Sequence, residues 1–170
     1  MNRWESGVRM GEITKVGIAE WKLCKTPDKI TTIGLGSCVG IVLYSNAGDY
    51  CGLVHIMLPS SKEIKNNSNR AKFADTGIED LLNALEGRGI RRNTLSAKIA
   101  GGAAMFQFSG KTDLGSVGER NVKAVKETLS SYKIPIVAED TGEDYGRTII
   151  FDSVSKKLLI RSAGKADKLI

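Results

Sequence analysis

The chain has 170 residues and a mass of 18.3 kDa, enough for one domain that buries a core without disulfide or metal staples. Hydrophobic residues make up 41% and charged residues 26%, an ordinary balance for a soluble globular protein, and no apolar run is long enough to cross a membrane. The net charge of +6 is interleaved with acidic residues along the chain, so the sequence predicts no nucleic-acid binding.

Short runs rich in Val, Ile and Thr predict strands in the first third of the chain, at residues 13–22, 29–33, 39–44 and 51–58. The stretch Asn46-Ala47-Gly48-Asp49 predicts a turn, so the last two of these strands form an antiparallel hairpin. In such a hairpin residue 38 lies opposite the later part of the following strand, which brings Cys38 and His55 to one end of the sheet.

The polar segment from Pro59 to Ala74 predicts an exposed, mobile loop, either an ordinary surface loop or a lid that docks substrate. A first helix is expected from Thr76, which has capping-box spacing to Glu79, and it ends at the glycines 87 and 89. Its apolar face comprises Ile78, Leu81, Leu82 and Leu85.

Ser116 and Glu119 repeat the capping-box spacing ahead of a second helix, which ends before Pro135. Further strands are predicted at residues 95–100, 134–138, 148–153 and 157–161. Each helix has one apolar stripe, so both should pack on a sheet. The fold class is α/β: a single-domain layered α/β sandwich with a mixed or antiparallel sheet and two main helices.

Cys38 follows a glycine-rich turn, and His55 is the chain's single histidine. A thiol beside an imidazole is the minimum equipment for covalent catalysis at an amide or ester carbonyl, with the imidazole taking the thiol proton to give an ion pair. The imidazole needs a group that holds its ring, and from the residues alone Thr31, Thr32 and Ser37 are equivalent candidates. Cys24 and Cys51 are expected to be small apolar residues inside strands.

Other chemistries find little support in the sequence. The glycine-rich turn lacks the third glycine of a dinucleotide fingerprint, because Val39 stands in its place. A zinc site would draw on Cys38, Cys51 and His55, without a Cys-x-x-Cys pair or a second histidine. Neither a metal nor an organic cofactor is therefore expected.

Several segments resemble the bacterial chemoreceptor glutamine deamidase family, CheD, in family order from about Val16 to Arg161. They are residues 32–38 (TIGLGSC), 52–59 (GLVHIMLP), 72–76 (KFADT), 98–106 (KIAGGAAMF), 118–121 (GERN) and 138–142 (AEDTG). The expected CheD-like domain spans residues 10–165, and residues 1–9 form a flexible N-terminal extension.

The resemblance implies a cysteine-dependent protein-glutamine deamidase that converts particular glutamines of methyl-accepting chemotaxis receptors to glutamate through a thioester. Cys38 is then the nucleophile, His55 the base, and Thr32 matches the family's catalytic threonine. Backbone N–H groups at Gly36, Ser37 and Cys38 would bind the oxyanion. The same chemistry could hydrolyse a glutamyl methyl ester.

The implied partners are the cytoplasmic domains of chemoreceptors and a CheC-type chemotaxis phosphatase, with no direct membrane insertion. A cytoplasmic location is expected, since the N-terminus lacks the apolar region of a signal peptide, and a monomer is the default oligomeric state. The alternative is a mainly non-catalytic regulatory partner of the CheC phosphatase. The simultaneous presence of Thr32, Cys38 and His55 favours the enzyme, because a pure binding protein has no chemical need for all three.

Overall fold

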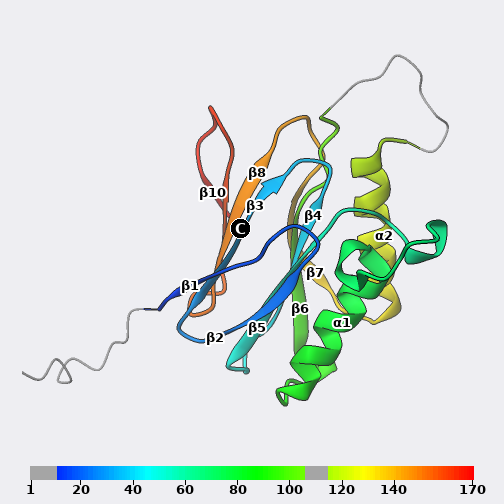
Figure 1. Ribbon diagram of the computed structural model, residues 1–170. Helices are drawn as coiled ribbons and strands as arrows, with labels where there is room; N and C mark the ends of the chain where they lie inside the picture. The colour runs from blue at the N-terminus through cyan, green and yellow to red at the C-terminus, as the bar shows by residue number, and fades with distance from the viewer. Residues whose placement is uncertain (1–10, 106–114) are drawn as a thin grey trace, which may run out of the picture.

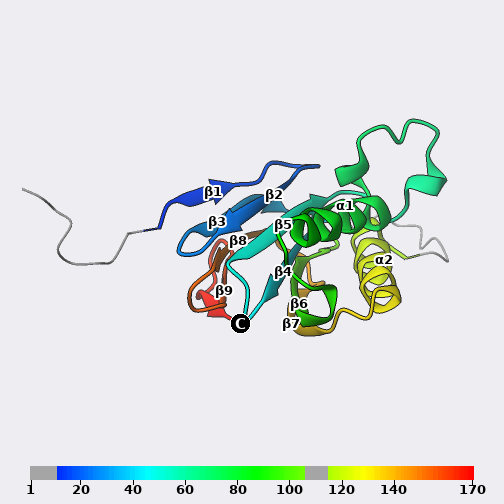
Figure 2. The same ribbon diagram turned by 90° about the horizontal axis from the view of Figure 1, so that it is seen from below.

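Two five-stranded sheets face each other, and two helices cover the outer face of one of them (Figures 1 and 2). The computed structural model describes residues 11–105 and 115–170. The predicted extension at residues 1–9 lies outside the described residues. The layered α/β sandwich expected from the sequence is confirmed, with two sheets in place of one.

The first sheet has the order β1-β3-β8-β9-β10. Its strands are β1 (Ile13–Lys15), β3 (Lys29–Leu35), β8 (Arg147–Asp152), β9 (Leu158–Arg161) and β10 (Lys168–Leu169). β1 runs parallel to β3, and the other neighbours are antiparallel. β10 follows residue 165, so the sheet continues past the expected domain limit.

The second sheet has the order β2-β5-β4-β6-β7. Its strands are β2 (Trp21–Lys25), β5 (Tyr50–Ile56), β4 (Val39–Ser45), β6 (Leu95–Gly101) and β7 (Ile136–Thr141). The predicted β4–β5 hairpin is confirmed, with Val39 opposite Ile56 and Gly40 opposite His55. β6 and β7 form the parallel pair of this sheet.

Every residue of β4 is buried, because this central strand has packing partners on both faces. Ile41 and Leu43 pack toward the helices, whereas Val42 and Tyr44 pack toward the first sheet. A strand covered on both faces has no solvent side, which explains why β4 is an unbroken apolar run without alternation.

Helix α1 (Ala74–Gly87) carries the predicted apolar face, whose four residues are fully buried against the second sheet. Helix α2 (Val117–Ser131) is capped as predicted, since Ser116 Oγ accepts from the backbone N–H of Glu119 at 3.2 Å. The capping box predicted for α1 is wrong: the helix begins at Ala74, and the Thr76 hydroxyl donates to the carbonyl of Arg70 instead.

The predicted strand at residues 13–22 is divided between the two sheets. β1 ends at Lys15, and the chain crosses through Gly17 and Ala19, which has a φ of 57°, before β2 starts at Trp21. The break follows from the connection, because β1 pairs with β3 whereas β2 pairs with β5 in the opposite sheet.

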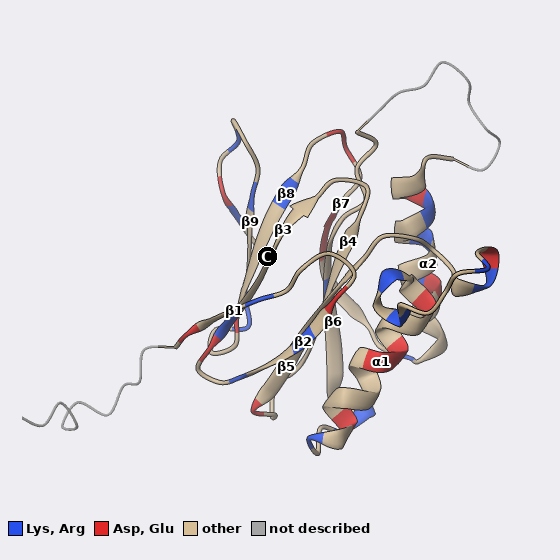
Figure 3. Ribbon diagram, in the orientation of Figure 1, with Lys and Arg blue, Asp and Glu red and all other residues tan. Residues whose placement is uncertain are grey.

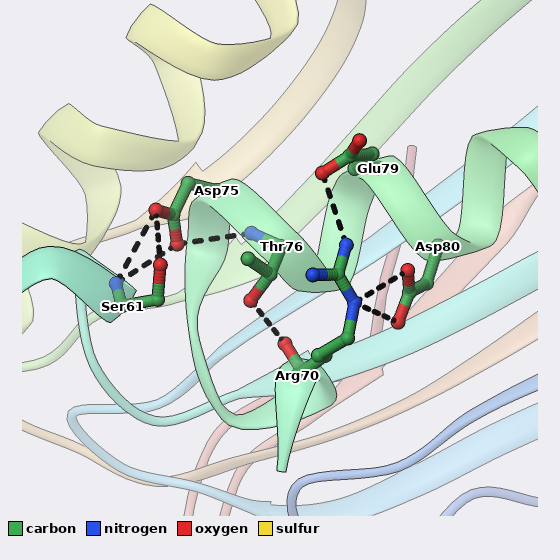
Figure 4. A network of polar contacts seen from close by, with 6 residues as sticks. All are labelled: Ser61, Arg70, Asp75, Thr76, Glu79 and Asp80. Atoms are coloured by element: carbon green, nitrogen blue, oxygen red, sulfur yellow. Dashed lines mark hydrogen bonds and ion pairs between the residues drawn. The ribbon is translucent and has the colours of Figure 1, made fainter. Parts of the chain in front are cut away.

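The loop between β5 and α1 is fastened at both of its ends (Figure 4). It contains the 3-10 turns η1 (Ser61–Glu63) and η2 (Arg70–Lys72). Asp75 accepts hydrogen bonds from the backbone N–H of Ser61 at 3.0 Å and from its hydroxyl at 2.8 Å. Arg70 forms ion pairs with Glu79 and Asp80 of α1. Residues 62–70 between these anchors are exposed, as predicted, but both ends of the predicted loop are buried, since Pro59, Phe73 and Ala74 pack into the fold.

Basic and acidic residues are intermingled over the strands and helices that the structure describes (Figure 3). A third 3-10 turn, η3 (Arg92–Thr94), precedes β6.

Within residues 11–105 and 115–170, no helix is long and apolar enough to pass through a membrane.

Candidate active site

Cys38 lies in the short connection between β3 and β4 and is partly exposed. The carbonyl of Gly36 accepts from Ala103 N, and that of Cys38 accepts from Gly102 N, each at 2.8 Å. Gly101 must be glycine at this close approach: its φ is +114°, and a Cβ would lie 2.2 Å from the carbonyl oxygen of Cys38. The backbone around the thiol is therefore held by the strand end of β6.

His55 lies on β5, fully buried, with its side chain directed between the two sheets. Its cross-strand partner is Gly40, two residues after Cys38. Cys38 and His55 are therefore diagonal neighbours on the same face, a relation that separates Cα atoms by roughly 7–8 Å and leaves long side chains within reach of each other. The predicted register, with residue 38 near the later part of β5, is confirmed.

Thr32 is the hydroxyl residue that contacts the imidazole, across the gap between the sheets. Its Oγ1 lies 2.7 Å from His55 Nδ1 and 2.8 Å from the carbonyl oxygen of Val16. Both contacts are satisfied only when the hydroxyl donates to Val16, which can only accept, and Nδ1–H donates to the hydroxyl. This network assigns the proton to Nδ1 and leaves the lone pair on Nε2.

The structure distinguishes the three hydroxyl residues that were equivalent candidates in the sequence. The Thr31 hydroxyl donates to the carbonyl of Ile149 at 2.7 Å, within the first sheet. Ser37 contributes its backbone carbonyl, which accepts from the side chain of Asn121 at 2.9 Å. Thr32 is therefore the hydroxyl residue that holds His55, as the resemblance implied.

Burial sets the resting charge of the thiol and the imidazole. Desolvation lowers the pKa of His55 to about 4, so the imidazole is neutral near pH 7. Desolvation also raises the pKa of the Cys38 thiol, and the smaller opposing effect is the hydrogen bond from its own backbone N–H. The resting pair is thus a neutral thiol and a neutral imidazole, which differs from the ion pair expected from the sequence.

His55 Nε2 is buried and has no hydrogen-bond partner among the described residues. An unpaired buried acceptor costs free energy, so its presence in a native structure calls for an explanation, and a catalytic role is one. With the proton on Nδ1, this nitrogen is the basic one. It can accept a proton.

The backbone N–H groups differ from the predicted oxyanion set at one residue. The N–H of Gly36 already donates to the carbonyl of Gly34 at 3.1 Å, so it is not free. Among the described residues, no carbonyl or side-chain acceptor outside Cys38 itself engages the N–H groups of Ser37 and Cys38. These two groups are the available donors beside the sulfur.

Asn121 is the residue of this region that sequence reasoning missed. It is fully buried on α2, and its Nδ2 donates to Ser37 O and to Met57 O, both at 2.9 Å. Its only sequence signal was its position in the segment 118–121, next to Arg120, which forms an ion pair with Glu63 of η1.

Cys24 and Cys51 lie directly opposite each other on β2 and β5 and are buried, free thiols. The expectation of small buried residues inside strands is confirmed. Over the described residues, no group of three or more His, Cys, Asp or Glu side chains is arranged to hold a metal ion.

The architecture so far defines a class: a two-sheet sandwich with a neutral thiol–imidazole pair, oriented by a threonine, at one end of its interior. The CheD chemotactic sensory transduction family model matches residues 57–162. A probable chemoreceptor glutamine deamidase CheD of Lachnoclostridium phytofermentans is 59% identical over 95% of this chain and 100% of its own length. The chain belongs to the CheD family.

Other relatives agree. A probable chemoreceptor glutamine deamidase CheD of Moorella thermoacetica is 54% identical over 92% of this chain and 94% of its own length. A crystal structure of a Neisseria meningitidis protein of the DUF152 family superposes with a TM-score of 0.48 and 9% identity, covering 78% of this chain and 64% of that chain. That likeness is too distant to support a conclusion about function.

Proposed function

We propose that the chain is a protein-glutamine deamidase that converts glutamines of chemoreceptors to glutamate, with Cys38 as nucleophile and His55 as base. One observation carries the proposal: the Thr32–His55 hydrogen bond fixes the tautomer that leaves Nε2 unprotonated, on a residue paired across the hairpin with Gly40, two residues after Cys38. The names of the relatives support the substrate class.

The reaction begins with the neutral pair. As Cys38 Sγ attacks the side-chain carbonyl of a substrate glutamine, its proton passes to His55 Nε2. The N–H groups of Ser37 and Cys38 stabilise the oxyanion, each worth about 3 kcal/mol in well-formed sites. His55 then protonates the leaving nitrogen, and the carbon–nitrogen bond breaks to release ammonia and leave a thioester.

Hydrolysis restores the enzyme. Water attacks the thioester while His55 Nε2 takes one of its protons, and the carbon–sulfur bond breaks to leave glutamate on the substrate. The proton returns from His55 to the sulfur, so the neutral pair is regenerated. A glutamyl methyl ester would follow the same course with methanol as the leaving group.

Exposed apolar side chains on β3 and after β6 favour a protein substrate. Ile33, directly after Thr32, is 68% exposed, and the 43% exposed Met105 lies over Gly36. Such side chains are ready to be covered by a partner. We infer that this face receives the cytoplasmic helices of the receptor, and that a CheC-type phosphatase, the other partner implied by the resemblance, uses the same face.

The test is mass spectrometry of a receptor cytoplasmic fragment after incubation with the protein. The wild type should produce glutamine-to-glutamate mass changes at particular positions, and Cys38→Ala should produce none. Cys24→Ala is the matched control, since it removes a cysteine away from the site and should retain turnover. Equal modification by Cys38→Ala and wild type would exclude the proposed nucleophile.

A second test addresses the docking face. Ile33→Asp replaces an exposed side chain, so folding should be preserved while a charge disfavours an apolar contact. Deamidation of the receptor fragment should fall through a raised KM, with acylation of Cys38 by a small ester unchanged. Unchanged KM would contradict a receptor contact at this position.

A further inference from the structure

The peptide that joins Ser37 to Cys38 is held differently from its neighbours. The carbonyls on either side, of Gly36 and Cys38, accept from backbone N–H groups of the segment after β6. The carbonyl of Ser37 accepts from the side chain of Asn121 instead, at 2.9 Å. A single side chain on α2 therefore controls the peptide immediately before the nucleophile.

The same amide also reaches the strand that carries the base. Its second hydrogen goes to the carbonyl of Met57 at 2.9 Å, two residues after His55. Both hydrogens of Nδ2 are thus used by acceptors, which fixes the orientation of the amide group. Asn121 is fully buried, so these contacts are shielded from bulk solvent. One NH₂ group sets the spacing between the Cys38 connection and the end of β5.

We propose that Asn121 is a positioning residue that aims the backbone N–H of Cys38 at the oxyanion of the reaction. A peptide unit is planar with its C=O and N–H on opposite sides, so anchoring Ser37 O directs Cys38 N–H the other way. That N–H points to the sulfur side, where it contacts Sγ of its own residue. Donation to the carbonyl also polarises the peptide and strengthens its N–H as a donor.

This role rests on the proposed acyl transfer at Cys38, yet its test does not need the receptor. Acylation by p-nitrophenyl acetate passes through an oxyanion, and release of p-nitrophenolate reports the rate. Alkylation by iodoacetamide is a displacement at carbon that forms no oxyanion. The ratio of the two rates for Cys38, after subtraction of the Cys38→Ala background, isolates oxyanion stabilisation from access to the thiol.

Asn121→Ala should lower the acylation rate about tenfold or more while alkylation stays close to wild type, because a misdirected donor loses much of the value of an oxyanion contact. Asn121→Asp keeps the side-chain shape but presents oxygen to both carbonyls. It should lower the ratio of acylation to alkylation rates by a similar factor. Val125→Ala truncates a fully buried residue one turn further along α2, and it should leave the ratio unchanged despite lowering stability.

The outcomes are distinguishable. An unchanged ratio in Asn121→Ala, or an equal fall in Val125→Ala, would show that Asn121 is merely part of the packing and would overturn the proposal. A wild type that is not acylated at Cys38 would overturn the oxyanion site and the role of Asn121 together. A wild type that is acylated but leaves every receptor fragment unchanged would overturn the proposed substrate and leave the role of Asn121 standing.

Discussion

Thr32 links three segments through one hydroxyl group: it accepts from the imidazole of His55 on β5 and donates to the carbonyl of Val16 after β1. A hydroxyl is suited to this place because it can accept and donate at once. A carboxylate in this position would attract a proton onto the ring and stabilise the imidazolium. Thr32 orients a ring that has to remain neutral until the thiol attacks the substrate carbonyl and gives up its proton.

Thr32→Val keeps the shape of the side chain and removes the hydroxyl, so it should lower kcat for deamidation about 10- to 100-fold because the correct tautomer is no longer held. It should also lower the free energy of unfolding by about 1–3 kcal/mol, since Val16 O and His55 Nδ1 lose their partner. Steady-state kinetics and urea titration measure both. Thr32→Ser retains the hydroxyl and should recover most of kcat; equal losses in Val and Ser variants would remove the hydrogen bond from the explanation.

Burial of neutral His55 makes the fold sensitive to acid. The pKa is about 4 in the folded protein and about 6.5 in the unfolded chain, so the unfolded state binds more protons between these values. The contribution of neutral His55 to the free energy of unfolding is fully present above pH 6.5. It is lost as the pH decreases toward 4, and the total loss from this residue is about 3 kcal/mol.

Urea unfolding at a series of pH values measures that loss. Carboxylates contribute their own acid dependence, so the informative quantity is the difference between wild type and His55→Gln, whose side chain does not titrate. The difference should shrink from pH 7 to pH 4 and then level off. A constant difference over this range would mean that His55 is not buried as a neutral ring.

Gly101, the last residue of β6, allows this strand to lie close to the backbone of Cys38. Gly101→Ala would place a methyl group 2.2 Å from the carbonyl oxygen of Cys38, at a φ of +114° that L-residues avoid. It should lower the unfolding free energy by more than about 2 kcal/mol and slow acylation of Cys38. Thermal unfolding and the ester assay test this. Gly87→Ala, in open space at the end of α1, should be neutral or stabilising by up to about 1 kcal/mol.

At the level of elements, the sequence predicted what is decided by local contacts. The α2 cap was predictable because Ser116 bonds to Glu119 within one turn. The start of α1 was not, because the Thr76 hydroxyl binds Arg70, which lies outside the helix. The division of residues 13–22 also depends on distant partners, since β1 needs β3 and β2 needs β5. Pairing between strands far apart in the sequence leaves no local signal.

In the candidate site, too, local contacts could be predicted and contacts between distant segments could not. Cys38 and His55 could be brought together from the sequence because one short hairpin joins them. Thr32 could be selected only through a family resemblance, since its contact with His55 crosses from one sheet to the other. Asn121 was invisible as a site residue, because its two acceptors are backbone carbonyls that carry no side-chain signature.

On the scale of the whole molecule, Arg147 joins the two sheets near the same end. Its side chain has no exposed surface; it donates to Gly142 O at 3.0 Å and pairs with Asp140 at 3.5 Å. Arg147 comes from β8, whereas Asp140 lies on β7 in the other sheet. The pair therefore fixes the first sheet to the second beside the turn that follows β6.

Arg147→Ala should lower the free energy of unfolding by about 3 kcal/mol, because it leaves the largely buried Asp140 carboxylate without its main partner. Arg161→Ala removes an arginine from an exposed pair with Asp167 and should cost less than about 1 kcal/mol. Urea unfolding at pH 7 compares them. Similar losses in both variants would mean that the buried pair does not hold the sheets together.

The order of the site residues along the chain has a consequence for biosynthesis. Thr32, Cys38 and His55 leave the ribosome well before Asn121, and before β8, the strand that flanks β3. Because domains complete their folding only when all their pairing partners have been made, a growing chain carries the thiol without the groups that align it. The nascent polypeptide therefore lacks the assembled acyl-transfer site, which is complete only after the last third of the chain has been translated.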